Sequence, residues 1–177
     1  MDEARASWVL EADGLSIDER AVSVCVLRLR DPDEALERAL GVVFGLTWPS
    51  TPNTIAGKTP RVAWLAPREW ALFDAAESLE TQVARTCGER LHHFADVSAG
   101  RRLFRIAGSY RRDLLAKGCS LDTHQSVFTS GRCAQTLLAQ IPILLILDGP
   151  AFEILVDVSL AGYLRAWLAD AALEYQS

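Results

Sequence analysis

The stretch ILLILDGPAFEILV (residues 143–156) decides the fold, because two apolar runs flank a turn dipeptide. Gly149 and Pro150 are typical turn residues, and the runs on either side, Ile143–Leu147 and Phe152–Val156, have the composition of buried strands. Strands joined by so short a connection run antiparallel. The sequence therefore predicts an antiparallel β-hairpin near the carboxyl end of the chain.

Further strands are predicted on the amino-terminal side of this hairpin. Arg61–Leu65 and Trp70–Asp74 flank a turn that contains Pro67, so they predict a second hairpin. The remaining strands are expected over Ala21–Leu29, Phe94–Ser98, Leu103–Ala107 and Cys133–Leu138.

Helices are indicated by capping residues that precede apolar residues at helical spacing. The clearest one begins at Asp31, which stands before Pro32, and ends at Gly45. The last one carries an apolar stripe as far as Tyr175, which predicts packing against a sheet. The second helix is expected to start at Ser78 and end at Gly88, and the third to start at Ser109 and end at Gly118. The last helix is expected to start at Ser159.

This order of elements predicts an α+β fold with mostly antiparallel sheets and helices packed on one face, in preference to a doubly wound parallel sheet. The length of 177 residues suits a single compact domain, 1–177. The first helix of each half starts at Asp31 and Ser109, and the second helix of each half starts at Ser78 and Ser159. The number of residues that separates the two starts is nearly the same for both pairs. We therefore predict a βαββα pseudo-repeat over residues 20–90 and 91–177.

Composition excludes several classes of protein. Half of the residues are hydrophobic and 23% are charged, so the chain is not intrinsically disordered. The formal net charge of −5 disfavours nucleic-acid binding, which depends on excess Lys and Arg. The apolar run Ile141–Leu147 is too short to cross a bilayer, and the acidic amino terminus does not resemble a signal peptide. We expect a cytoplasmic protein with reduced cysteines and neither membrane nor nucleic acid as partner.

Motifs for cofactors and metals are not found in the sequence. It has no glycine-rich dinucleotide loop, P-loop or serine-hydrolase elbow, so no cofactor site is predicted in this chain. Cys87, His92 and His93 are nominal metal ligands. However, Cys87 falls on the apolar stripe of a helix, and adjacent histidines in a strand point to opposite faces. We therefore predict no metal site there.

A possible nucleophilic site is Cys119 with Asp122 and His124. Such a site needs a stabilised thiolate, whereas the carboxyl end of the preceding helix presents partial negative charge. We interpret the segment instead as a loop in which Asp122 and His124 satisfy backbone groups, and we predict no catalytic residue.

The charge distribution is uneven. Residues 101–132 carry seven basic and two acidic residues, whereas residues 1–37 carry ten acidic residues and four arginines. This polarity predicts docking to a larger partner. An alternative is a solvated surface whose arginines pair locally. The residues that we expect at the partner contact are Arg101, Arg105, Arg112 and Arg132.

The second half of the chain resembles the gamma subunit of heterotetrameric sarcosine oxidase. The resemblance fades before residue 60, extends loosely through Trp64-Leu65 and Glu69-Trp70, and departs from the family pattern at Tyr110 and Leu160. The residues that carry it are DVSAGR (96–101), Gly108, RDLLAKGC (112–119), Leu121-Asp122, His124, Phe128, GRCAQT (131–136), Tyr163 and Trp167-Leu168.

The resemblance implies a fold like that of a folate-dependent aminomethyltransferase domain and a place in a complex with alpha, beta and delta subunits. Such complexes oxidise the N-methyl group of sarcosine to give glycine, hydrogen peroxide and either formaldehyde or a one-carbon unit on tetrahydrofolate. The resemblance places FAD, FMN, NAD, tetrahydrofolate and zinc on the partner subunits, with no cofactor in this chain. It gives no catalytic residue to carry over.

The leading hypothesis is therefore an accessory, non-catalytic subunit of a sarcosine oxidase-like complex. One alternative is a free-standing folate-binding or one-carbon-transfer protein, in which Asp96 or Asp122 would bind the pterin and Arg101 or Arg132 the glutamate carboxylates. Another alternative is a subunit of a related oxidase or dehydrogenase for a different N-methyl amine.

Overall fold

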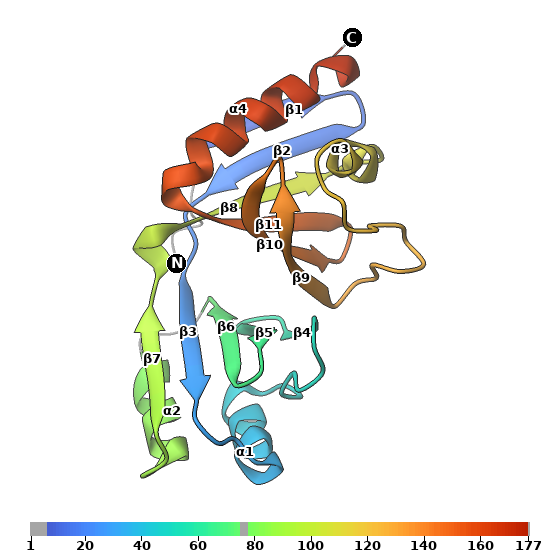
Figure 1. The fold of residues 1–177 in the computed structure, drawn as a ribbon. Coiled ribbons are helices and arrows are strands. Elements are labelled where there is room, and N and C mark those ends of the chain that lie inside the picture. The colour runs from blue at the N-terminus through green and yellow to red at the C-terminus, as the bar shows by residue number, and fades with distance from the viewer. Residues whose placement is uncertain (1–6, 75–77, 177) are drawn as a thin grey trace. The chain divides into compact units, whose positions relative to one another are not determined.

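The computed structural model describes residues 7–74 and 78–176, which divide into two compact units (Figure 1). Unit 1 combines the residues up to Val22 with those from Ala99 onward, and unit 2 is the intervening segment Ser23–Ser98. All strand pairs found in the described residues are antiparallel. None of the helices in this part of the chain has both the length and the hydrophobicity needed to cross a bilayer.

Unit 1 forms, within the described residues, a six-stranded sheet in the order β1-β2-β8-β11-β10-β9. Helices α3 (Arg111–Ala116) and α4 (Ala161–Ala171) accompany it, and η2 (Val158–Leu160) and η3 (Leu173–Tyr175) are 3-10 turns on either side of α4. The strands are β1 (Trp8–Ala12), β2 (Leu15–Arg20), β8 (Arg101–Ala107), β9 (Arg132–Leu138), β10 (Ile141–Asp148) and β11 (Ala151–Asp157).

One face of the unit 1 sheet forms a core with both helices. Four apolar residues lie opposite one another on neighbouring strands, so their side chains share that face. They are Ile17 on β2, Ile106 on β8, Phe152 on β11 and Leu147 on β10. Their core cluster also contains apolar residues of α3 and α4. Burial of a side chain as large as Phe152 stabilises the fold by about 1.5–3 kcal/mol.

Unit 2 forms a five-stranded sheet, counted over the described residues, in the order β4-β5-β6-β3-β7. Leu27 and Trp70 lie opposite each other on the face that packs against helices α1 and α2. The elements are β3 (Val24–Leu29), α1 (Glu34–Phe44), β4 (Ile55–Gly57), β5 (Arg61–Ala66), β6 (Glu69–Phe73), α2 (Leu79–Cys87) and β7 (His92–Asp96), followed by the 3-10 turn η1 (Ser98–Gly100).

The predicted α+β class with antiparallel sheets and helices on one face is confirmed, and so are both predicted hairpins, β5–β6 and β10–β11. The strands are divided between two sheets, which the sequence analysis did not predict. The single-domain boundary 1–177 and the pseudo-repeats 20–90 and 91–177 stay predictions.

Several predicted boundaries were wrong. Helix α1 is capped by Asp33 instead of Asp31, because the Asp33 carboxylate accepts a hydrogen bond from the Leu36 amide at 2.8 Å. Helix α3 begins after Tyr110, and the Ser109 hydroxyl donates instead to the Gly14 carbonyl at 3.4 Å. Ser159 lies in the 3-10 turn before α4, where Asp157 accepts from its amide.

Candidate partner-contact site

Unit 1 contains all seven basic residues of the segment 101–132, which supplies β8, α3 and the start of β9. The four predicted contact residues do not form one continuous patch. Arg101 and Arg105 lie on one face of the unit 1 sheet. Arg132 lies on the opposite face, which also carries Phe152, and Arg112 of helix α3 stacks on Phe152.

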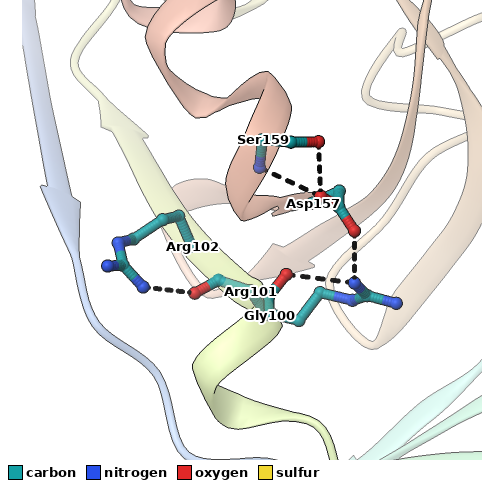
Figure 2. A network of polar contacts seen from close by, with 5 residues as sticks. All are labelled: Gly100, Arg101, Arg102, Asp157 and Ser159. Carbon is teal, nitrogen blue, oxygen red and sulfur yellow. Dashed lines mark hydrogen bonds and ion pairs between the residues drawn. The ribbon is translucent and has the colours of Figure 1, made fainter.

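Arg101 is engaged inside unit 1 (Figure 2). It lies directly opposite Asp157 across β8 and β11, and its Nη1 lies 2.8 Å from Asp157 Oδ2 and 3.0 Å from the Gly100 carbonyl. Asp157 also accepts hydrogen bonds from the Ser159 amide and hydroxyl. These bonds from Ser159 first, and then the Arg101 charge, hold the pKa of Asp157 below its usual value. Arg101 therefore links the start of β8 to the end of β11 through this ion pair.

Arg102 and Lys117 also have acidic partners outside the segment. Arg102 lies 4.0 Å from the buried carboxylate of Glu19, which pairs more closely with Arg165 at 2.6 Å. Figure 2 shows the Arg102 side chain on the other side of the chain from Arg101, with its Nη1 donating to the Arg101 carbonyl. Lys117 pairs with Glu174 at 2.5 Å. Much of the excess positive charge of the segment is thus balanced within the fold.

Arg105 occupies the middle of β8, half-buried, between two acidic cross-strand neighbours. Asp18 lies opposite it on β2, and Glu153 lies opposite it on β11. Glu153 also pairs with Arg20 at 3.0 Å. Side chains directly opposite in an antiparallel pair have Cβ atoms about 4.5–5.5 Å apart, so Arg105 has an acidic residue beside it on each neighbouring strand. Its guanidinium makes no ion pair within 4.0 Å among the described residues.

Arg112 of helix α3 is half-buried, and no carboxylate lies within 4.0 Å of its guanidinium among the described residues. Its guanidinium lies over the Phe152 ring, 5.1 Å from the centroid, and its Nη2 lies 3.4 Å from the Phe128 carbonyl. In the described part of the chain, Arg112 Nη1 and Arg111 Nε are buried without a hydrogen-bond partner. Burial first, and then the Arg111 charge, lower the pKa of Arg112.

Arg132 lies at the same end of the sheet. It is exposed at the start of β9, opposite Leu147 on β10, which is itself opposite Phe152 on β11. Neighbouring strands are about 4.8 Å apart. The backbone of Arg132 on β9 therefore lies two strand spacings from that of Phe152 on β11, the residue on whose ring Arg112 stacks. Its side chain makes no hydrogen bond or ion pair within the ranges 7–74 and 78–176.

The structure therefore brings Arg112 and Arg132 to one end of the sheet, together with Arg111. Arg111 was missed by the sequence analysis, although its position next to Arg112 in SYRRD (109–113) was a visible signal. The Arg111 Nη1 donates to the Gly108 carbonyl at 2.6 Å, so its guanidinium is held against the turn that follows β8.

The segment Cys119–His124 is a loop, as predicted. The Asp122 carboxylate accepts from the His124 amide at 2.8 Å, and the His124 ring contacts the Ser126 hydroxyl at 2.7 Å. Cys119 is buried, and its Sγ lies 4.0 Å from Thr136 Oγ1. The three side chains are thus directed to different partners and do not form a thiol–imidazole–carboxylate relay.

The other nominal metal and folate ligands also have local roles. Cys87 is buried in the core of unit 2, and the His92 ring contacts the Arg90 carbonyl at 2.9 Å. In the described ranges no three His, Cys, Asp or Glu side chains are grouped closely enough to hold a metal ion. Asp96 accepts from the Ser98 amide at 2.8 Å, and its hydrogen bonds with Ser98 lower its pKa.

Comparison with known proteins gives the family. A model of the sarcosine oxidase, gamma subunit family matches residues 28–174. The chain belongs to this family. As a member of the gamma subunit family, it is similar to sarcosine oxidase subunit gamma of Corynebacterium sp. (strain U-96), with 30% identity over 152 residues that cover 82% of this chain and 73% of that protein. The resemblance found in the sequence is thus confirmed.

Solved structures show the same relationship. This protein is similar to one chain of heterotetrameric sarcosine oxidase from Corynebacterium sp. U-96 in complex with pyrrole 2-carboxylate. The two chains are 26% identical with a TM-score of 0.83, and the match covers 96% of this chain and 89% of that chain. It is also similar to the glycine cleavage system aminomethyltransferase T from Bartonella henselae, with 12% identity, a TM-score of 0.58 and coverage of 84% and 43%. The second likeness shows that the predicted aminomethyltransferase-like fold is present.

Proposed function

We propose that this chain is an accessory, non-catalytic gamma subunit of a heterotetrameric sarcosine oxidase-like complex, in which it assembles with alpha, beta and delta subunits. The observation that carries the proposal is the similarity to a chain of heterotetrameric sarcosine oxidase over 96% of this chain. The complex converts sarcosine, O₂ and water to glycine, formaldehyde and hydrogen peroxide, or passes the methyl carbon to tetrahydrofolate.

The polar geometry supports an accessory role. Asp157 binds Arg101 and Ser159, Glu19 binds Arg165, and the carboxylates of Asp96 and Asp122 cap turns. Such groups stabilise the fold, and each is already hydrogen-bonded. Following what the resemblance to the gamma subunit family implies, we assign FAD, FMN, NAD, tetrahydrofolate and zinc to the partner subunits.

We also propose partner contacts at the four predicted arginines. Arg112 and Arg132 carry this proposal, because they lack carboxylate partners in the described residues. Arg101 and Arg105 are weaker candidates, since Asp157 and the pair Asp18 and Glu153 already lie beside them.

Co-purification tests the proposed function. The chain, tagged at its amino terminus, is co-expressed with the alpha, beta and delta subunits encoded by the same organism, and the affinity eluate is analysed by size-exclusion chromatography and mass spectrometry. We expect the four chains to elute together in equal amounts and to produce peroxide from sarcosine. A parallel expression without the tag controls for adhesion to the resin. Elution of the tagged chain alone would contradict the proposal.

A further inference from the structure

We propose that the end of the unit 1 sheet formed by Arg111, Arg112 and Arg132 is a carboxylate-binding surface that receives acidic side chains of a partner subunit. We call these three residues the arginine surface. The inference rests on the proposed function, because it names the chemistry by which this subunit binds its neighbours.

The first support is charge that the fold leaves unbalanced. Among the basic residues of the segment 101–132, Arg101, Arg102 and Lys117 are within 4.0 Å of Asp157, Glu19 and Glu174 respectively. The arginine surface has no such carboxylate in the part of the chain that the structure describes. Arg105, the remaining basic residue, has Asp18 and Glu153 opposite it on the neighbouring strands. The arginine surface is therefore the part of the segment whose charges have no carboxylate beside them among the described residues.

The second support is that Arg112 is already held in position. Its guanidinium stacks on Phe152, which is completely buried, and Phe152 contacts Phe128 with the ring centroids 6.1 Å apart. A stacked guanidinium loses little conformational freedom when a carboxylate binds to it, and its planar fork matches the two carboxylate oxygens. These properties explain why arginines are enriched among the residues that dominate protein interfaces.

The third support is desolvation. Buried guanidinium nitrogens usually have a hydrogen-bond partner, and those that lack one require an explanation. Arg112 Nη1 and Arg111 Nε are covered by the chain itself and have no partner among the described residues, so they show that the two guanidinium groups are partly desolvated and are not themselves the atoms that a partner would contact. Burial also lowers the pKa of Arg112. Because this charge is partly removed from water in the free chain, a carboxylate that approaches it is screened less than at a fully exposed arginine.

The arrangement of the three arginines suits a protein surface. Arg132 is exposed and stands two strands from Phe152, so it adds a second, solvent-accessible charge beside the half-buried Arg112. A central arginine that is stacked and partly desolvated, with a more exposed charge at its side, matches the buried centre and polar rim of a protein interface.

Two variants test the arginine surface in the co-expressed complex. Arg112→Met removes the charge but keeps an apolar side chain on Phe152, and Arg132→Glu reverses an exposed charge without disturbing the core. Arg85→Met is the matched control, since Arg85 is an exposed arginine of α2 in unit 2. For each variant we would measure the unfolding midpoint of the isolated chain, and its affinity for the other subunits at low and high salt.

We expect Arg112→Met to keep or raise the unfolding midpoint, because it removes an unbalanced, partly buried charge, and to weaken binding about thirtyfold or more. Arg132→Glu should slow association at low salt and have a smaller effect at high salt. The control should bind as the wild type does. This combination of undiminished stability and lost affinity distinguishes a binding residue from a structural one.

Other results would overturn the inference. If the wild-type chain and both variants bind the subunits equally at both salt concentrations, the arginine surface is a solvated face, while the proposed function stands. If the wild-type chain binds none of the subunits, the proposed function itself is wrong. If the variants abolish only self-association of the isolated chain, measured by sedimentation, the partner is a second copy of this chain and our choice of partner is wrong. If Arg112→Met fails to fold, Arg132→Glu decides alone.

Discussion

At the scale of single residues, Asp33 shows how closely spaced acids differ in structural importance. Its Oδ1 accepts from the Leu36 amide, and its Oδ2 lies 2.8 Å from Arg90 Nη2. The hydrogen bond from Arg90 first, and then the one from Leu36, lower the pKa of Asp33 to about 2. The sequence DPDE (31–34) contains three acids, and local pattern alone favoured Asp31 as the cap.

We predict that Asp33→Ala lowers the midpoint of thermal unfolding by about 2–4 °C at neutral pH, because it removes a helix cap. The folded pKa of about 2 lies below the ordinary value near 3.9, so this stabilisation is complete above that value and is lost as the pH falls toward 2. Melting curves of both proteins should therefore converge in acid. Asp31→Ala is the control, and a larger effect there than at Asp33 would refute the assignment of the cap.

Cys119 allows a second test at this scale. Because it is buried against Thr136 and the His124 ring contacts Ser126, we predict that Cys119→Ala changes turnover of the assembled complex less than threefold, about 0.65 kcal/mol in activation free energy. Steady-state kinetics of the purified complex would measure it. A hundredfold loss of kcat, with assembly intact, would instead support a nucleophilic thiol.

At the scale of elements, β2 explains why part of the fold was not predicted. Its alternate residues Leu15, Ile17 and Glu19 are all buried, but the third is charged and therefore hides the alternation of a half-buried strand. Glu19 is tolerated there because Arg165 of α4 binds it at 2.6 Å, a contact between residues far apart in the sequence. By contrast, β10 contains the apolar run Ile143–Leu147, and β11 is mostly apolar apart from the buried Glu153, so both strands were predicted closely.

Gly108, which follows β8, fixes how closely the chain approaches the β1–β2 turn. Its φ is +105°, and a Cβ atom there would lie 2.2 Å from the Gly14 carbonyl oxygen. We predict that Gly108→Ala destabilises the protein by about 2 kcal/mol or more, because backbone atoms would have to move. Urea unfolding would measure the change in the free energy of unfolding.

Gly162→Ala in α4 is the matched control for Gly108→Ala. Apart from its two chain neighbours and the backbone of its own helix, no atom lies within 4 Å of the position of an added Cβ at this exposed glycine, so the substitution should stabilise the protein by about 0.5–1 kcal/mol. Equal effects of the two substitutions would show that the close approach at Gly108 is unimportant.

At the scale of the whole molecule, the sequence predicted the fold class and the family but not the partition of strands between sheets. Local patterns show that β8 is a strand, yet not that its neighbours are β2 and β11. The same limit applies to the site. Seven basic residues were visible in the sequence, but only the fold shows that Asp157, Glu19 and Glu174 balance three of them.

We predict that the isolated chain is colourless and produces no peroxide from sarcosine, because the proposed function assigns the flavins to other subunits. An absorbance spectrum of the purified chain should lack the visible flavin bands, and adding FAD or FMN followed by desalting should not introduce them. The co-expressed complex is the positive control. If the isolated chain retained flavin in an amount equimolar with the protein, the assignment of the flavins to other subunits would be refuted.

Strands β2 and β8 are hydrogen-bonded neighbours, although all of unit 2 separates them in the sequence. A ribosome therefore releases β1 and β2 long before their sheet can be completed. An isolated two-stranded hairpin is marginally stable, whereas unit 2 is continuous from Ser23 to Ser98 and has its whole core available as soon as it emerges. During synthesis, unit 2 should fold first while the β1–β2 hairpin waits for β8, so a nascent chain that stops near Ser98 would combine a folded segment with an unprotected amino-terminal ribbon.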